Sequence, residues 1–148
     1  MARVWVGVIG AGECDDGLAE LAEQVGRYIA RAGAVLVCGG MGGVMEAACR
    51  GGKAEGGLTV GILPGSSREE ANPYVDVPIA TGLTEARNLV IIKTADVLIA
   101  VGGSYGTLSE IGFALKAGKR VVGLHTWDIP GIERADTPAQ AVTLALGH

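Results

Sequence analysis

The sequence has few residues suited to metal or redox chemistry. It contains three cysteines and two histidines in 148 residues, and their spacing matches no metal-binding pattern. Cys14, Cys38 and Cys49 are odd in number, which does not fit a disulfide framework. We expect small buried thiols in a reducing compartment and no metal site. Because Cys38 precedes a Gly-Gly pair, its thiol could also line a pocket.

Long apolar runs and clusters of basic residues are also missing. No run approaches the ~20 apolar residues that cross a bilayer. The apolar run at residues 4–9 is followed by acidic residues without a cleavage site, so we interpret it as a core strand and not a signal peptide. The net charge is −4, and Lys and Arg occur mostly singly. We therefore expect a cytoplasmic protein without a membrane or nucleic-acid partner.

What the sequence does contain is typical of a globular α/β protein. With 49% hydrophobic and 19% charged residues, the composition excludes disorder. The length predicts one domain over residues 1–148. The 25 glycines show no repeat, and most follow apolar runs, as expected for tight turns between strands and helices.

Apolar runs and helical patterns alternate along the chain. Strands are expected at 4–9, 34–38, 59–63, 97–101 and 120–124, with a short one at 79–80. Helices are expected at 18–32, 44–53, 85–94, 108–117 and 137–146, and a long loop at 66–78. Continuously apolar strands separated by helices predict a mainly parallel sheet in a doubly wound, Rossmann-like three-layer sandwich. In such sheets, ligands bind beyond the carboxyl ends of the strands.

A strand followed by a glycine-rich turn and a helix occurs twice. The first copy is VLVCGGMGGVMEAA at 35–48, and the second is VLIAVGGSYGTLSEIGFAL at 97–115. Aligning their glycines places Glu46 opposite Glu110. Such turns leave backbone N–H groups free at a helix N-terminus, where phosphate binds. Two such turns predict a site for a phosphorylated small molecule.

The second glycine-rich turn allows two interpretations. Gly102 and Gly103 permit close approach of a ligand, the Thr107 hydroxyl can donate, and the amides of residues 105–108 can form a phosphate nest. The same segment also fits a capping box, in which Glu110 would bond back to the N–H of Thr107. Spacing alone leaves both interpretations open.

Arg87 occupies an unusual position. If Thr84 is the N-cap, Arg87 lies in the first helical turn, where a cation opposes the helix dipole at a cost of about 0.3–1 kcal/mol. A ligand anion or a carboxylate partner would explain this placement. The alternative is a solvated surface arginine. His125, beside Trp127, is interpreted as a packed loop residue and not as a catalyst.

Two common nucleotide motifs fail in detail. The turn after the first strand begins Gly10-Ala11-Gly12, but Asp15 occupies the place of the third glycine of a dinucleotide fingerprint. We expect Asp15 or Asp16 to cap the following helix instead. Lys53 is followed by Ala54 where a P-loop needs Ser or Thr. We therefore expect neither a NAD or FAD cofactor nor ATP hydrolysis.

Four segments in order, GGMGGVMEAA, GGLTVGILPG, EARNLVII and ADVLIAVGGSYGTLSEIGFAL, resemble the successive motifs of the LONELY GUY (LOG) proteins, long misnamed lysine decarboxylases. The resemblance extends over residues 35–124. That superfamily includes phosphoribohydrolases that cleave the N-glycosidic bond of nucleoside 5′-monophosphates. It also includes the molybdenum cofactor carrier protein and the DNA-processing protein DprA. The short chain looks most similar to the carrier branch.

The resemblance implies roles for individual residues. Contact with the phosphate or nucleotide is implied for Gly39, Gly40, Gly42, Gly43, Met45, Gly102, Gly103, Ser104, Tyr105, Gly106 and Thr107. Arg87 and Glu110 would be the catalytic residues of an enzyme, with Glu110 on the ribose. Two residues depart from the family pattern: Val101 replaces a proline, and Asn88 replaces a lysine, which removes a positive charge.

These implications lead to two main hypotheses. The chain is either a carrier for a nucleotide monophosphate or a molybdopterin-type ligand, or a nucleoside 5′-monophosphate phosphoribohydrolase; it is not a lysine decarboxylase. Neither role requires a further cofactor. A homodimer or homotetramer is implied by the resemblance. A DNA-linked role like that of DprA is a third alternative, which the acidic charge disfavours.

Overall fold

The computed structural model describes residues 3–147. Within these residues, seven strands form one parallel sheet with the order β4-β3-β2-β1-β5-β6-β7. The strands are β1 (Trp5–Gly10), β2 (Val35–Cys38), β3 (Leu58–Leu63), β4 (Val77–Ala80), β5 (Val97–Val101), β6 (Arg120–Leu124) and β7 (Ile132–Ala135). The α-helices are α1 (Asp16–Arg31), α2 (Val44–Ala54), α3 (Arg87–Thr94), α4 (Tyr105–Lys116) and α5 (Pro138–Ala145). Two 3₁₀ turns, η1 (Arg68–Glu70) and η2 (Thr84–Ala86), complete the secondary structure.

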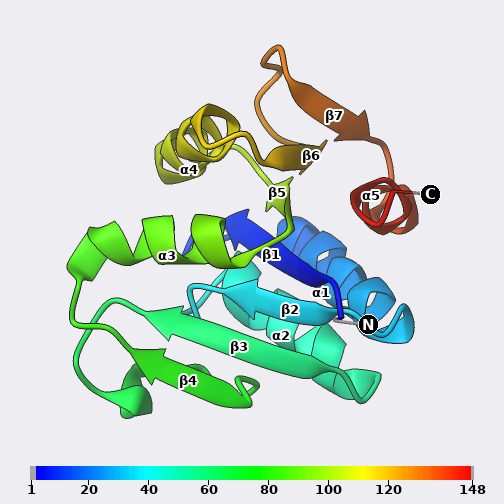
Figure 1. Cartoon of the computed structure of the whole chain (residues 1–148). Helices are drawn as coiled ribbons and strands as arrows, with labels where there is room; N and C mark the ends of the chain where they lie inside the picture. The colour runs from blue at the N-terminus through cyan, green and yellow to red at the C-terminus, as the bar shows by residue number, and fades with distance from the viewer. Residues whose placement is uncertain (1–2, 148) are drawn as a thin grey trace.

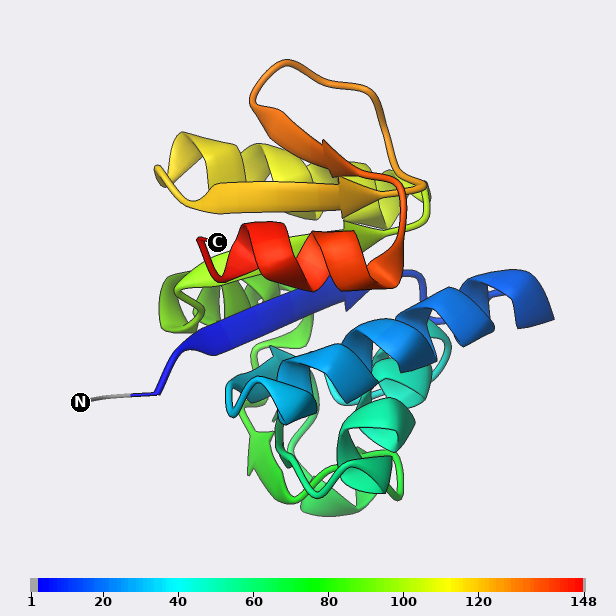
Figure 2. The ribbon, with the colours of Figure 1, turned by 90° about the vertical axis from the view of Figure 1, so that its right-hand side faces the viewer.

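Helices cover both faces of the sheet (Figure 1). Buried side chains of α1, α2 and α5 pack with one set of strand residues, and those of α3 and α4 pack with the other set. Figure 2 shows α1, α2 and α5 together in front of the sheet. The predicted Rossmann-like, doubly wound three-layer sandwich is therefore confirmed. None of the described helices combines the length and apolarity that a membrane crossing requires.

The order of the strands reverses next to β1. This strand pairs with β2 on one side and with β5 on the other, and Gly10 lies opposite Val101. The turns that follow β1 and β5 therefore start side by side. In parallel sheets, such a switch point opens a crevice at the carboxyl ends of the strands.

Helices α1 and α2 cross at two glycines. A Cβ atom on Gly26 would lie 1.9 Å from the carbonyl oxygen of Ala48, and one on Gly51 would lie 1.9 Å from that of Glu23. Both positions thus require a residue without a side chain. This close approach carries α2, and the glycine-rich turn before it, to the carboxyl end of β1.

Most expected elements are confirmed, with differences at their ends. Asp15 caps α1 by accepting from the N–H of Leu18, as one of the two expected caps. The helix expected at 85–94 is divided, because η2 precedes α3. Strand β4 takes up the end of the expected 66–78 loop. Strand β7 was not expected: its sequence IERA is half polar, as is common for an edge strand.

Candidate functional site

A cavity of about 440 Å³ opens at the carboxyl ends of β1, β2 and β5, within the size range of small-molecule sites. Its lining residues come from five segments that are far apart in the sequence. They are Val8, Ile9, Gly10, Ala11, Gly12, Gly39, Met41, Met45, Pro64, Arg87, Asn88, Ile91, Ser104, Gly106, Thr107 and Glu110. The cavity thus lies at the switch point of the sheet, where the topology predicts a ligand.

The second glycine-rich turn reaches the cavity through the start of α4. Ser104 is the N-cap: its Oγ accepts from the N–H of Thr107 at 3.1 Å and lies 2.7 Å from the Thr107 hydroxyl. The capping-box interpretation is therefore wrong, because the helix begins at Tyr105 and not beyond Thr107. Of the expected nest of amides, those of Tyr105 and Gly106 have no acceptor among residues 3–147.

An aromatic pair supports this turn from outside the cavity. The indole N–H of Trp127 donates to the carbonyl oxygen of Ser104 at 3.0 Å. The rings of Trp127 and Tyr105 are stacked, with centroids 5.9 Å apart. Tyr105 itself is 83% exposed and does not line the cavity. His125, expected to be packed, is an exposed loop residue with a φ of 53°.

Arg87 is the first residue of α3 and reaches across to β2 and β3. Its Nη1 donates to the carbonyl oxygens of Gly39 and Ile62, each at 2.6 Å. Among the described residues, no carboxylate oxygen lies within 4.0 Å of the guanidinium, and Nε is buried without a partner. Burial lowers the pKa of Arg87, but an arginine stays charged in proteins.

These contacts decide between the two interpretations of Arg87. The side chain is half-buried and fixed, so the solvated surface arginine is excluded. Thr84 is not the N-cap that was expected. Its φ is 56°, and its hydroxyl donates to the carbonyl oxygen of Leu83.

Glu110 projects from the second turn of α4 into the same cavity. No hydrogen bond or ion pair to its carboxyl group occurs within residues 3–147. Burial raises the pKa of Glu110 to about 7, and the positive charge of Arg87 partly opposes that rise. A carboxyl group that titrates near neutral pH can accept or donate a proton under physiological conditions.

The first glycine-rich turn contributes Gly39, Met41 and Met45 to the cavity. Gly40 has a φ of 74°, and a Cβ there would lie 2.7 Å from the side chain of Leu63. Beneath the turn, the Sγ atoms of Cys38 and Cys49 lie 3.5 Å apart, and the Cys38 thiol accepts from the N–H of Gly40. Both thiols are buried, so Cys38 supports the turn and does not line the cavity.

The structure thus brings together part of the predicted set. Seven predicted residues line the cavity: Gly39, Met45, Arg87, Ser104, Gly106, Thr107 and Glu110. Six do not: Gly40, Gly42, Gly43, Gly102, Gly103 and Tyr105. Residues 8–12 were not predicted to line the site. Their Gly-Ala-Gly turn lies at the end of a strand, where a ligand is expected in a parallel sheet. Met41, Pro64 and Ile91 gave no separate signal. Asn88 had been noted only as a departure from the LOG pattern.

Comparisons with known proteins agree with this architecture. The molybdenum cofactor binding protein from Rippkaea orientalis is 38% identical, with a TM-score of 0.92 over 97% of this chain and 96% of that one. The molybdenum cofactor carrier protein from Chlamydomonas reinhardtii is 36% identical, with a TM-score of 0.87 over 96% of each chain.

A relative that is named as an enzyme aligns with a smaller part of this chain. The cytokinin riboside 5′-monophosphate phosphoribohydrolase of Mycobacterium marinum is 36% identical over 123 residues. The alignment covers 74% of this chain and 64% of that protein's length. The sequence model of the SLOG cluster4 family matches residues 3–145. The resemblance to the LOG superfamily and its molybdenum cofactor carrier branch is therefore confirmed, and the chain belongs to the SLOG cluster4 family.

Proposed function

We propose that this protein binds a phosphorylated small molecule with a planar heterocycle in the cavity at the switch point. One observation carries the proposal most directly: Arg87 is a half-buried cation without a carboxylate within 4.0 Å among the described residues. Burying an uncompensated charge is costly, and an anionic ligand would offset that cost. The relatives support a small-molecule-binding protein of the LOG fold.

The cavity lining offers two kinds of contact. At the start of α4, the amide of Gly106, which lines the cavity, and that of the neighbouring Tyr105 have no acceptor among residues 3–147, and the hydroxyls of Ser104 and Thr107 lie 2.7 Å apart. This helix start suits a phosphate. The lining also contains the thioether side chains of Met41 and Met45, and thioethers make favourable contacts with flat rings. Glu110 and Arg87 would contact the sugar or the corresponding linker.

The favoured role is binding without turnover, as in a carrier for a nucleotide monophosphate or a phosphorylated pterin of the molybdopterin type. Asn88 lines the cavity where LOG hydrolases carry a lysine, so this site has one fewer positive charge. Two solved relatives of nearly the same length are described as molybdenum cofactor binding or carrier proteins.

Hydrolysis of a nucleoside 5′-monophosphate is the second candidate, favoured by the elevated pKa of Glu110. Water would add to C1′ of the ribose as the bond from C1′ to the base nitrogen breaks. The base would leave with a proton derived from the water, and ribose 5-phosphate would be the other product. In its ionised form, Glu110 would accept a proton from the attacking water and stabilise the oxocarbenium-like transition state. Arg87 would orient the phosphorylated sugar.

Calorimetric titration with AMP and with a pterin monophosphate, followed by chromatography for free base, tests both roles. We expect wild type to bind at least one probe, and Arg87→Met to weaken binding by about tenfold or more. Arg134→Met is the matched control. Arg134 is exposed, forms a surface ion pair with Asp128 at 3.6 Å and does not line the cavity. Binding of neither probe by the wild-type protein would contradict the proposal.

Glu110→Gln separates the carrier from the hydrolase. If wild type releases adenine from AMP and Glu110→Gln does not, while affinity changes by less than about threefold, the protein is a hydrolase. Binding without base release in either protein identifies a carrier.

A further inference from the structure

The segment between β3 and β4 contacts the first glycine-rich turn through Asn72. Among residues 3–147, the buried polar side chains are those of Thr59, Asn72 and Thr107. Asn72 is 8% exposed and belongs to no helix or strand. A buried amide side chain in an irregular segment has to satisfy its hydrogen-bonding groups within the protein.

Asn72 does so mainly by holding the glycine-rich turn. Its backbone N–H donates to the carbonyl oxygen of Gly40 at 2.8 Å. Its Nδ2 donates to the carbonyl oxygen of Met41 at 2.9 Å. Its Oδ1 accepts from the N–H of Tyr74 at 2.9 Å, which fixes the orientation of the amide.

Together with Arg87, Asn72 engages three successive carbonyl oxygens of the turn. Arg87 binds the oxygen of Gly39, and Asn72 binds those of Gly40 and Met41. The peptide planes of the turn are therefore fixed. The N–H groups of residues 41–43 have no acceptor within the described part of the chain, and Met41 lines the cavity.

We propose that Asn72 is a positioning residue for the ligand, because it holds the peptide of Met41, which lines the cavity. The inference rests on the proposed function, since it assumes that a ligand occupies this cavity. Asn72 does not line the cavity, and it acts through the backbone of the turn. Loss of its Nδ2 donor would free the Met41 peptide to rotate. This wall of the cavity would then be less ordered in the ligand-free protein.

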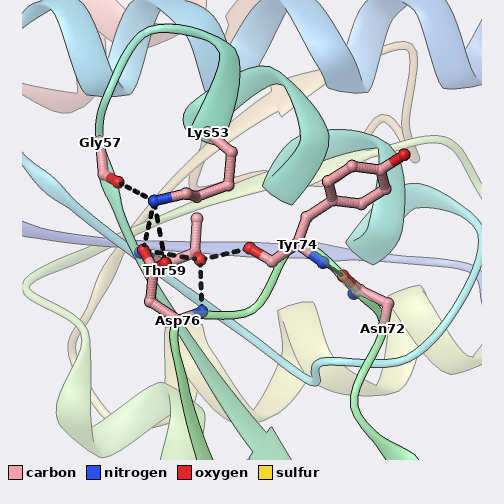
Figure 3. Close-up of polar contacts among 6 residues, drawn as sticks. All are labelled: Lys53, Gly57, Thr59, Asn72, Tyr74 and Asp76. Atoms are coloured by element: carbon pink, nitrogen blue, oxygen red, sulfur yellow. Dashed lines mark hydrogen bonds and ion pairs between the residues drawn. The ribbon is translucent and has the colours of Figure 1, made fainter.

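A second polar network holds the same segment closer to β4 and offers a matched control (Figure 3). The hydroxyl of Thr59 donates to the carbonyl oxygen of Tyr74 at 2.6 Å and accepts from the N–H of Asp76 at 2.9 Å. The Asp76 carboxylate pairs with Lys53 at 2.8 Å. None of these side chains lines the cavity, so this network anchors the segment without contacting the ligand wall.

The variants Asn72→Asp and Thr59→Val distinguish positioning from simple stabilisation. Asn72→Asp keeps the size of the side chain and the acceptor for Tyr74, but replaces the donor to the Met41 carbonyl with an acceptor. Thr59→Val removes the hydroxyl of the control network at almost constant volume. We expect both to lower the melting temperature, by roughly 2–8 °C. Asn72→Ala, which removes the donor without adding charge, carries the test if Asn72→Asp does not fold.

The deciding measurements are ligand affinity and amide hydrogen exchange in the folded proteins. With the probe, AMP or pterin monophosphate, that wild type binds, the Asn72 variant is expected to bind about tenfold more weakly and Thr59→Val within about twofold of wild type. The amides of residues 41–43 are expected to exchange faster only in the Asn72 variant.

Equal affinity in wild type and the Asn72 variant, or an equal loss of affinity in both variants, would overturn the positioning role. Failure of wild type to bind either probe would overturn the proposed function and this role with it.

Discussion

Glu110 and Arg87 are the two ionisable side chains in the cavity lining, and neither is neutralised by a direct partner within residues 3–147. Their placement in two helices was predictable, because the helices expected at 85–94 and 108–117 contain them. Their environment was not. The sequence could not show that Arg87 spans two backbone carbonyls or that the capping box fails, since both depend on where α3 and α4 begin.

The raised pKa of Glu110 predicts a pH-dependent stability. The ordinary pKa is 4.5, and the folded value is about 7, so the folded state favours the protonated carboxyl group. The resulting stabilisation is fully present below pH 4.5 and is lost as the pH rises through about 7. Glu110→Gln removes this dependence. As the pH rises from about 5 to about 8, we expect the free energy of unfolding of the variant to increase by about 1–3 kcal/mol relative to that of wild type.

Thermal or urea unfolding of wild type and Glu110→Gln at a series of pH values measures this effect. Glu133→Gln serves as the control, because Glu133 pairs with Arg120 at the protein surface and does not line the cavity. A difference between Glu110→Gln and wild type that stays constant with pH would show that Glu110 ionises normally.

At the scale of single elements, the sequence predicted most of the parallel strands and helices well. Strands β5 and β6 coincide with the predicted ranges, because each contains a short β-branched apolar run bounded by turn or charged residues. The predicted start of α4 was three residues late, because Tyr105 and Gly106 suggested a turn and Ser104 was not considered as a cap. Strand β7 was missed because an edge strand needs no apolar run.

Two glycines inside helices, one at the crossing of α1 and α2 and one in α4, are expected to respond oppositely to substitution by alanine. Gly26→Ala would place a Cβ 1.9 Å from the carbonyl oxygen of Ala48, forcing the helices apart. We expect a loss of about 2–4 kcal/mol in the free energy of unfolding. Gly112→Ala, in α4, meets nothing within 4 Å and is expected to stabilise by about 0.5–1 kcal/mol.

Urea unfolding of both variants gives the two values directly. Because α2 carries the first glycine-rich turn to the cavity, Gly26→Ala is also expected to weaken ligand binding, whereas Gly112→Ala is not. A Gly26→Ala protein as stable as wild type would show that the helices do not approach as closely as described.

At the scale of the whole molecule, the parallel sheet assembles the site. The switch in strand order beside β1 brings the turns after β1, β2 and β5 to one edge, and α3 adds Arg87 from the opposite face. Alternation of strands and helices predicted this edge from the sequence. The strand order, which places β1 and the turn after it between β2 and β5, required the structure.

The most direct test of the proposed binding site is a ¹⁵N–¹H NMR titration of the wild-type protein with the phosphorylated probe that it binds in calorimetry. We expect the largest shifts for the backbone amides of Tyr105 and Gly106, which lack acceptors among the described residues, and for those of residues 41–43. Because amide protons shift strongly when they gain an anionic acceptor, these resonances report the ligand's position. Saturable shifts confined to another surface, with these amides unchanged, would contradict the proposed site.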